Sequence, residues 1–425
     1  MVSSRIPGLH QLDRMGRLQR LHDAGWLSDA DVESLADGRA LDSTRADKII
    51  ENALGVYALP FGVATNFRIN ARDYLIPMVI EEPSVVASAS HAARIVRAAG
   101  GFAASSTGRL MVGQVQLLEV PDLEAAEREI RLHGDALIGL ANDAHPAMVR
   151  RGGGARGVEV HHVLADDGEE MLVLHLLVDT RDAMGANTIN TMVEAVAPAA
   201  EILSGGRACL RILSNYTDHC LAGASCTIAA DLLTSGDYDG RQVVDGIVAA
   251  GRLAEADLHR AVTHNKGVMN GVDAVLIATG NDWRAIEAAA HAYASRSGRY
   301  RSMTAWRKDE AGNLVGNLEL PMPVGLVGGS IGLNPGTRVA HALLGLSRAE
   351  ELAQVVVAVG LAQNLGALKA LVTHGIQRGH MALQARSVAL LAGAPSAEVD
   401  RVAKELVKRG DITVAGAREL LAGPA

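Results

Sequence analysis

Aromatic residues are scarce in this 425-residue chain: Phe, Trp and Tyr make up 3% of it, although 48% of all residues are apolar. There is enough apolar material for large cores, but these must be built from Ala, Val, Leu and Ile. Cysteine is scarce too, and the spacing of Cys209, Cys220 and Cys226 does not resemble a metal site. Three cysteines without a disulfide pattern favour a reduced, cytoplasmic setting.

The chain also lacks an excess of positive charge and an unbroken apolar run. Its formal net charge is −8 and its pI is about 6.0, which argues against a general nucleic-acid-binding protein. The most apolar stretch, VVVAVGLAQNLGALKALV at 355–372, is interrupted by Gln363, Asn364 and Lys369. A membrane span needs ~20 mainly apolar residues, so this stretch predicts a buried helix. The N-terminal MVSSRIPGLHQLDRM lacks the apolar core of a signal peptide, so we expect no membrane segment.

Domain organisation is predicted from chain length and from the order of elements. One core rarely exceeds ~250–300 residues, so 425 residues indicate several domains. The segment 108–218 predicts the order β-α-β-β-α-β, typical of a ferredoxin-like domain. We therefore predict an α+β fold. It has a large, mostly helical domain at 1–107 and 219–374, an inserted small domain at 108–218, and a mobile C-terminal helical flap at 375–425.

Individual elements are predicted from periodicity, caps and turn residues. Outside the insert, helices are expected within 12–55, with Ser28 as an N-cap, and at 84–101, with strands at 55–70 and 72–84. Helices and glycine-rich connections are expected from 219 to 374. In the insert, strands are expected at 110–120, 157–166, 171–180 and 207–215, and helices at 122–141 and 187–203.

One connection has the composition of an anion site. DAMGAN, at 182–187, links a predicted strand to a helix, and its small residues let a ligand approach the backbone. Free N–H groups at a helix start favour a pyrophosphate. The alternative is an ordinary turn with Asn187 as the cap. No G-x-G-x-x-G motif lies in a βαβ unit, which disfavours a Rossmann fold, and GLVGGSIG at 325–332 lacks the Lys-Ser/Thr of a phosphate loop.

Two adjacent carboxylates end a predicted strand in EEPS at 81–84. If proline fixes one of them in a dry cleft, its pKa rises and it can donate a proton near neutrality. The alternative is a pair of solvated glutamates on a loop, and this is the better interpretation of the motif in isolation.

A lysine stands on a small, polar support in THNKGVMNG at 263–271, which suggests a tight and flexible segment. An ammonium such as that of Lys266 can stabilise a developing oxyanion. Asp282 follows an apolar run, so we expect it to be buried with Lys266 as a partner. The alternative is a surface lysine and a helix-capping aspartate.

A fourth candidate, His380, opens a helix of the C-terminal flap in QRGHMALQAR. Histidine can deliver a proton near pH 7. The alternative is a helix-start histidine without chemistry, because the chain contains 15 histidines.

Together these stretches resemble class II 3-hydroxy-3-methylglutaryl-coenzyme A (HMG-CoA) reductase. No single run is decisive, but the ordered set is specific and covers nearly the whole chain. The matching runs are ENALG (51–55), EEPS (81–84), DAMGANTIN (182–190), RILSN (211–215), HNKGVMNG (264–271), ATGNDWRA (278–285), PMPVGLVGG (321–329), VGLAQNLGA (359–367) and GIQRGHMAL (375–383).

The resemblance implies two successive hydride transfers between a nicotinamide cofactor and HMG-CoA, giving mevalonate and CoA, or the reverse. It implies that Lys266 stabilises the oxyanion, Glu82 donates a proton, and Asp282 joins both in one network that titrates as a unit. His380 would protonate the departing CoA thiolate. Residues that would hold the HMG portion are Ser84, Arg260, Asn270, Gln363 and Asn364. Residues that would line the cofactor site are Asp182, Met184, Gly185, Asn187 and His145.

The resemblance favours NAD(H), with NADP(H) left open by one departure. Where the NAD-using pattern has an aspartate for the adenosine ribose, this chain has His145, with Arg150 and Arg151 nearby. Loss of that carboxylate removes a repulsion against a 2′-phosphate. The resemblance also implies a homo-oligomer, at least a dimer, with active sites between subunits.

Two other functions fit parts of the sequence. One is a nicotinamide-dependent aldehyde or hydroxy-acid dehydrogenase without CoA chemistry. The other is a non-catalytic CoA- or nucleotide-binding protein, which the presence of all four candidate catalytic residues disfavours.

Overall fold

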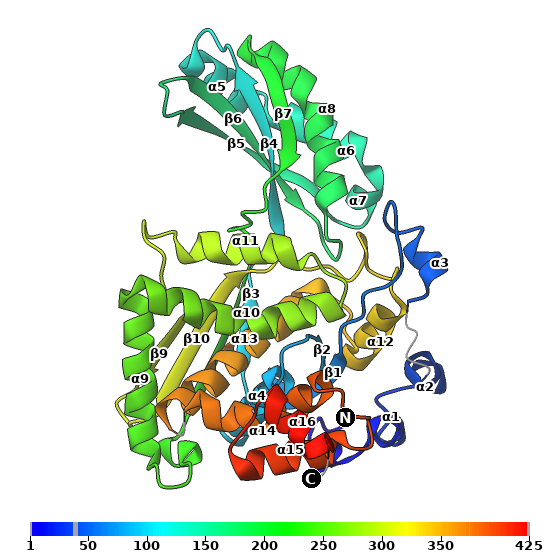
Figure 1. Ribbon diagram of the computed structural model, residues 1–425. Coiled ribbons are helices and arrows are strands. Elements are labelled where there is room, and N and C mark those ends of the chain that lie inside the picture. The colour runs from blue at the N-terminus through cyan, green and yellow to red at the C-terminus, as the bar shows by residue number, and fades with distance from the viewer. Residues whose placement is uncertain (1, 37–40, 374, 423–425) are drawn as a thin grey trace.

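The chain folds into a large body with a smaller lobe standing on it (Figure 1). This computed structural model describes residues 2–36, 41–373 and 375–422, apart from the side chains of 376–383. The small lobe is formed by one continuous stretch of chain.

The N-terminal segment is helical, as expected, and packs on one side of the body (Figure 1). It contains a short 3-10 helix, Leu9–Gln11, followed by α1 (Arg14–Asp23), α2 (Asp29–Ala36) and α3 (Ser43–Ala46). The hydroxyl of Ser28 accepts from the Asp31 backbone N–H at 3.3 Å, which confirms Ser28 as the cap of α2.

A hairpin and a helix carry the EEPS motif. Strands β1 (Phe61–Ile69) and β2 (Arg72–Val79) pair antiparallel, and α4 (Val85–Ala98) follows directly. Gly100 and Gly101 both have positive φ and end the helix region as predicted.

The large body contains a sheet that the sequence patterns did not reveal. Four antiparallel strands pair in the order β3 (Ala103–Ser106), β8 (Leu221–Ile228), β10 (Leu314–Pro321) and β9 (Thr304–Lys308). The expectation of only helices and glycine-rich connections after 219 was therefore wrong. The accompanying helices are a 3-10 helix (Ala230–Leu233), α9 (Gly240–Ala256), α10 (Leu258–Ala278), α11 (Trp283–Ala294), α12 (Pro335–Leu344) and α13 (Ala349–Val372).

Helix α13 is the central helix of the body. It is long and apolar enough to cross a membrane, yet 72% of its most apolar window is buried inside the protein. The prediction of a buried helix is therefore confirmed. Asn364 fixes α13 against the sheet, because its side-chain carbonyl accepts from Trp306 Nε1 at 2.8 Å and from Thr304 Oγ1 at 3.0 Å.

The small lobe has the predicted ferredoxin-like order of elements and a core of its own. Its strands pair antiparallel in the order β5-β6-β4-β7, and helices cover one face of this sheet (Figure 1). The single helix expected at 122–141 is two helices, because the chain turns at His133. The elements are β4 (Leu110–Leu118), α5 (Leu123–Leu132), α6 (Gly134–Ala144), α7 (Pro146–Arg150), β5 (Gly154–Leu164), β6 (Glu170–Asp179), α8 (Ala186–Ser204) and β7 (Arg207–Leu213).

The C-terminal segment forms a separate helical cluster. Helices α14 (Ile376–Leu391), α15 (Val399–Arg409) and α16 (Val414–Ala422) bury apolar side chains among themselves. Gly375, at φ 79°, joins this cluster to the end of α13. The exact domain limits and the movement of this flap stay predictions.

Candidate active site

Two of the predicted catalytic residues meet on the large body. The Lys266 ammonium lies 2.6 Å from a Glu82 carboxylate oxygen, although 184 positions separate them in sequence. Asn270, one helical turn beyond Lys266, donates to the same oxygen at 3.3 Å. The Lys266 and Glu82 side chains stay 62% and 34% exposed. Such exposed ion pairs contribute about 1 kcal/mol or less to stability, so this contact is better explained by a functional role than by a stabilising one.

Glu82 is positioned by the connection between β2 and α4. Ser84, the N-cap of α4, has φ 78°, a left-handed conformation that is uncommon for residues other than glycine. Its hydroxyl is buried, and among the described residues it has no hydrogen-bond partner. Strained backbone and unpaired buried polar groups cluster at ligand sites, so Ser84 suits the predicted substrate contact.

Lys266 sits on a rigid support, in contrast to the flexible one expected. The segment THNKGVMNG forms the middle of α10. A Cβ at Gly271 would lie 2.9 Å from the Cβ of Gln363 and 3.1 Å from the Val359 carbonyl oxygen, both on α13. Gly271 therefore lets α10 and α13 approach closely, and this packing outweighs the low helix propensity of glycine and asparagine.

Asp282 does not join the Lys266–Glu82 contact within one chain. Its carboxylate caps α11, accepting from the Ala285 N–H at 3.1 Å, and its side chain is 44% exposed beside Arg284. From Lys266 to the end of α10 the helix alone extends about 18 Å, at 1.5 Å per residue. The expectation of a buried Asp282 paired with Lys266 was therefore wrong for a single subunit, because α10 separates the two residues.

The buried acid of this region is Asp273, which sequence reasoning missed. It lies on the same face of α10 as Lys266 and Asn270, two turns beyond the lysine. Burial, followed by the hydrogen bond and charge of Glu287 on α11, raises the pKa of Asp273 to about 9. The hydrogen bond from His291 lowers the pKa of Glu287, so Asp273 holds the proton of this pair. In the sequence Asp273 is flanked by apolar residues, so nothing near it indicates its partner Glu287, which lies on the next helix.

The other predicted substrate residues differ in accessibility. Arg260 lies in the first turn of α10, and the described residues offer its guanidinium no acidic partner, so its fork is free for a carboxylate ligand. Gln363 is buried on α13, with an unpaired side-chain oxygen among the described atoms. Asn364 is 1% exposed and engaged with Trp306, so its contact with substrate stays a prediction.

The loop before α8 connects the small lobe to the large body. The Asp182 carboxylate accepts from the Ala349 N–H at 2.7 Å, and its carbonyl accepts from Leu326 and Val327. A Cβ at Gly325 would lie 2.5 Å from the Met184 nitrogen, so the glycine run at 325–332 permits close approach of this loop. The glycine run therefore has a structural role where the small lobe meets the large body.

The start of α8 has the features of an anion site. Its N-cap is Gly185, at φ 85°, and a Cβ there would lie 2.3 Å from Thr180 Cγ2, so only glycine fits. The alternative in which Asn187 is the cap was wrong, because Asn187 lies inside the helix. Within the described part of the chain no side chain caps the first N–H groups of α8, which leaves them available for a phosphate.

His145 lies beside this helix start, as predicted. Its Nδ1 accepts from the Met148 N–H at 3.3 Å, and its Nε2 lies 3.4 Å from Thr188 Oγ1 in the first turn of α8. Arg150 and Arg151 follow at the exposed end of α7. The residues at this helix start therefore fit a dinucleotide phosphate.

The fourth catalytic candidate cannot be placed at the level of atoms. His380 falls within α14, but its side chain lies outside the described residues. Its predicted role stays a prediction.

Comparison with known proteins agrees with this geometry. The family model of hydroxymethylglutaryl-coenzyme A reductase matches residues 13–385. The 3-hydroxy-3-methylglutaryl-coenzyme A reductase of Archaeoglobus fulgidus is 48% identical over 421 residues, which is 99% of this chain and 94% of the relative. A probable reductase of Borreliella burgdorferi is 34% identical over 80% of this chain and 77% of its own length.

Solved structures give the same result. A reductase from Streptococcus pneumoniae is 46% identical, with a TM-score of 0.85 over 98% of this chain and 99% of its own. A class II reductase from the same species, bound to NADPH in open conformations, has a TM-score of 0.84 over 86% of this chain and 99% of its own. The motifs, the fold and these matches show that the chain belongs to the hydroxymethylglutaryl-coenzyme A reductase family, class II.

Proposed function

We propose that this protein interconverts HMG-CoA and mevalonate plus CoA by two hydride transfers. The observation that carries the proposal is the contact of Glu82 with Lys266 and with Asn270, which joins two family motifs far apart in sequence. When bound, the nicotinamide cofactor supplies one hydride in each reduction. The remaining steps are the work of the chain's own residues.

Lys266 stabilises the negative charge that grows on the substrate carbonyl oxygen in both reductions. Its ammonium is fixed on α10 and more than half exposed, so a substrate oxygen can approach it. Glu82, within hydrogen-bond reach of the lysine, delivers a proton to the aldehyde oxygen in the second reduction. Between the reductions the hemithioacetal loses CoA as a thiolate, and His380 protonates that sulfur.

The HMG portion binds beside this pair. Arg260 pairs its guanidinium with the free carboxylate of the substrate, because no acid among the described residues occupies it. The Ser84 hydroxyl and Gln363 side-chain oxygen offer hydrogen bonds that the described residues do not satisfy. Asn270 holds Glu82 in place from the same helix face as Lys266.

CoA fits along α4, which starts at Ser84. Positive charge gathers at the far end of this helix: Arg94 and the buried Lys369 of α13 lower the pKa of His91, after burial. Burial and Arg94 likewise lower the pKa of Lys369, and among the described residues no acid pairs with this lysine. From Ser84 to Arg94 the helix advances about 15 Å. An uncompensated cationic group at that distance suits the phosphates of a CoA whose thioester lies near Lys266.

The nicotinamide cofactor binds at the start of α8. The loop of Asp182, Met184, Gly185 and Asn187 lines this place, with the uncapped N–H groups turned to a phosphate. NADH is the cofactor that the family resemblance favours. His145 in place of an acid and the exposed Arg150 and Arg151 favour a 2′-phosphate, so we propose that the site accepts NADPH as well.

The working unit is at least a dimer in the cytoplasm, with Asp282 acting on the site of a second subunit. Lys266 is open to solvent within one chain, whereas hydride chemistry needs water to be excluded. Two hollows of about 650 and 770 Å³ lie elsewhere on the body and include neither Lys266 nor Glu82 among their lining residues. A second subunit supplies the missing cover and brings its exposed Asp282 carboxylate to the network.

The test compares Lys266→Ala with Lys308→Ala, which removes another exposed, ion-paired lysine of the same body. We expect Lys266→Ala to abolish reduction of both HMG-CoA and added mevaldehyde, with unchanged circular dichroism. Lys308→Ala keeps both activities. Near-normal turnover by Lys266→Ala would exclude the proposed role. Cofactor oxidation without release of free thiol from HMG-CoA would instead favour a dehydrogenase without CoA chemistry.

A further inference from the structure

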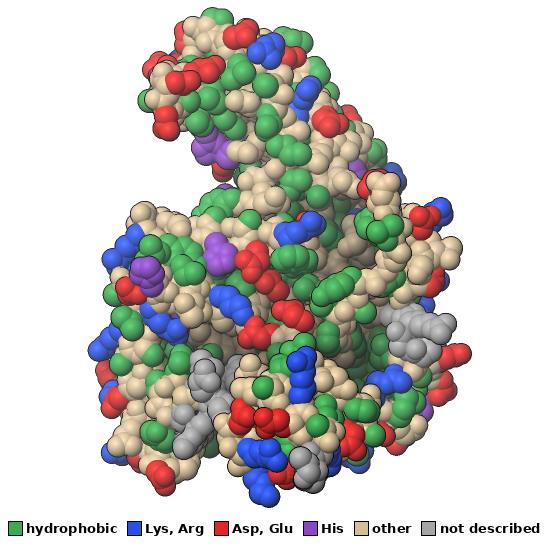
Figure 2. Space-filling model, in the orientation of Figure 1, with side chains coloured by type: hydrophobic (Ala, Val, Ile, Leu, Met, Phe, Trp, Pro, Cys, Tyr) green, Lys and Arg blue, Asp and Glu red, His purple; other side chains and the backbone are tan. Residues whose placement is uncertain are grey.

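The small lobe has an open sheet face that the proposed reaction does not use. Its helices α5, α6 and α8 cover the opposite face, where Leu172, Leu174 and Leu176 are fully buried (Figure 1). Side chains alternate along a strand, so the residues between these leucines point to the open face. Histidine side chains are visible on the underside of the lobe in Figure 2.

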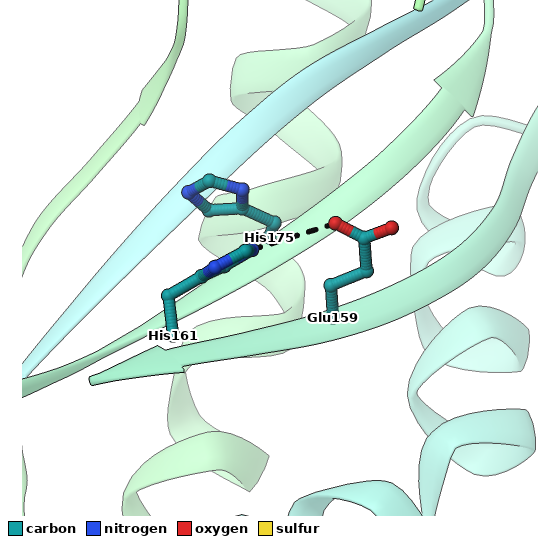
Figure 3. A group of neighbouring side chains, drawn as sticks. All are labelled: Glu159, His161 and His175. Atoms are coloured by element: carbon teal, nitrogen blue, oxygen red, sulfur yellow. Dashed lines mark ion pairs between the residues drawn. The ribbon is translucent and has the colours of Figure 1, made fainter.

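Three metal-binding side chains converge on this open face. Glu159 of β5 stands directly opposite His175 of β6, and His161 follows two positions along β5 on the same face. One ligand atom from each of the three lies within 4.8 Å of the others. Figure 3 shows the two rings side by side with the carboxylate turned toward them. The His161 Nε2 to Glu159 Oε2 distance is 3.4 Å, and the two ring centroids are 4.2 Å apart.

A fourth residue holds His175 in place from the neighbouring strand. Gln114 of β4 is in register with His175, and its side-chain amide nitrogen lies 2.8 Å from the His175 Nε2. A half-turn of the amide presents its oxygen to a ring N–H instead. Outer-shell contacts of this kind orient metal-bound histidines and leave the other ring nitrogen for the ion. The ligand atoms therefore rest on paired strands whose register fixes their spacing.

From this arrangement we propose that Glu159, His161 and His175 bind a divalent transition-metal ion, with Zn²⁺ as the best match. Two imidazoles and one carboxylate form a known set of protein ligands for zinc, and water completes the tetrahedron. Calcium and magnesium prefer oxygen ligands alone, so the two histidines select against them.

The chain supplies a matched control one residue away. His162 also lies on β5 and pairs with an acid, with its Nε2 2.7 Å from Glu127 Oε2. Its side chain points to the other face of the sheet, beside α5. Among the described residues, it does not belong to the group of potential metal ligands. Loss of His162 removes a histidine–glutamate pair of similar geometry without touching the proposed site.

The experiment is calorimetric titration of the full-length, tag-free protein with ZnCl₂ in a buffer without chelators. We expect one Zn²⁺ per chain, bound at least tenfold more weakly by His161→Gln and by His175→Gln. His162→Gln binds like the unaltered protein, and Gln114→Leu binds about 10–100-fold more weakly because the outer shell is lost. Circular dichroism of every variant checks the fold.

A second measurement reads the coordination itself. Co²⁺ in place of Zn²⁺ gives a visible absorption band of tetrahedral type, and this band is lost in His161→Gln and His175→Gln but kept in His162→Gln. Absence of stoichiometric Zn²⁺ binding by the unaltered protein overturns the proposal. So does binding that persists undiminished in both histidine variants, because the ion then lies elsewhere.

Discussion

Asp273→Asn tests whether the carboxyl on the same face of α10 as Lys266 keeps its proton. In the folded protein the pKa of Asp273 is raised from 3.8 to about 9, first by burial and then by Glu287. Between these two values the folded state therefore binds a proton that the unfolded state releases. Stability is highest at low pH and is lost as the pH rises toward 9. Asparagine removes this dependence, because its neutral amide can donate to Glu287 as the protonated acid does.

The magnitude follows from proton linkage. One bound proton changes the free energy of unfolding by about 1.4 kcal/mol per pH unit, so the unaltered protein loses about 2–3 kcal/mol between pH 6 and pH 8 through this group. The lowered pKa of Glu287 changes stability only below its usual value of 4.5, outside this window. We therefore expect Asp273→Asn to gain about 2–3 kcal/mol relative to the unaltered protein over that interval.

The assay is urea unfolding at several pH values, followed by the fluorescence of Trp306. This side chain is fully buried in the large body, and Trp26→Phe and Trp283→Phe in both proteins remove the other signals. Following one domain matters because a chain with several cores need not unfold in one step. Glu310→Gln, which removes an exposed acid at the β9–β10 turn, serves as the control and keeps the original pH slope. Equal slopes for Asp273→Asn and the unaltered protein would show that Asp273 does not carry the proton.

Three further predictions concern the small lobe, the flap and the cofactor. Gly185→Ala forces a Cβ within 2.3 Å of a threonine methyl at φ 85°, so we expect a loss of about 1–3 kcal/mol in lobe stability and weaker cofactor binding. Gly134→Ala, where no atom lies within 4 Å of the new Cβ, is the neutral control in thermal unfolding and cofactor titration. His380→Gln should slow thiol release from HMG-CoA more than reduction of added mevaldehyde, and equal losses in both assays argue against its role. NADPH as well as NADH should support turnover, and Arg151→Ala should lower kcat/KM for NADPH alone. If the ratio of kcat/KM for NADPH to that for NADH does not change, Arg151 does not contribute to cofactor selection.

The sequence predicted best where local signals and tertiary packing agree. Two strands before EEPS and a helix after it follow from strand alternation and the glycine pair, and β1, β2 and α4 were found there. The order of elements in the small lobe was also predictable, since alternation between periods of 2 and 3.6 residues is strong there. One predicted helix became two at His133, because the apolar periodicity continues across this point although Gly134 follows it directly.

Long-range packing decided the cases that the sequence could not settle. Residues 263–271 form a helix because Gly271 fits against α13, a contact between segments about ninety positions apart. The body's sheet escaped prediction because its edge strand β3 has four small residues and pairs with β8, more than a hundred positions later. Asp273 lies within the apolar run and Asp282 follows its end, and only the fold reveals which of them faces another helix.

The open position of the Lys266–Glu82 pair explains why the chain keeps elements that its core does not need. An enzyme with the proposed function exchanges its cofactor between two reductions and therefore requires a site that opens, so permanent burial of Lys266 would obstruct turnover. Water must then be excluded from the Lys266–Glu82 pair by elements that do not belong to the main core. The C-terminal cluster α14–α16 meets this condition, because it packs on its own apolar residues and joins α13 through Gly375, where φ is 79° and a side chain would meet nothing within 4 Å. We infer that the flap and a second subunit share the exclusion of water, since the exposed Asp282 lies about 18 Å or more along α10 from the lysine of its own chain.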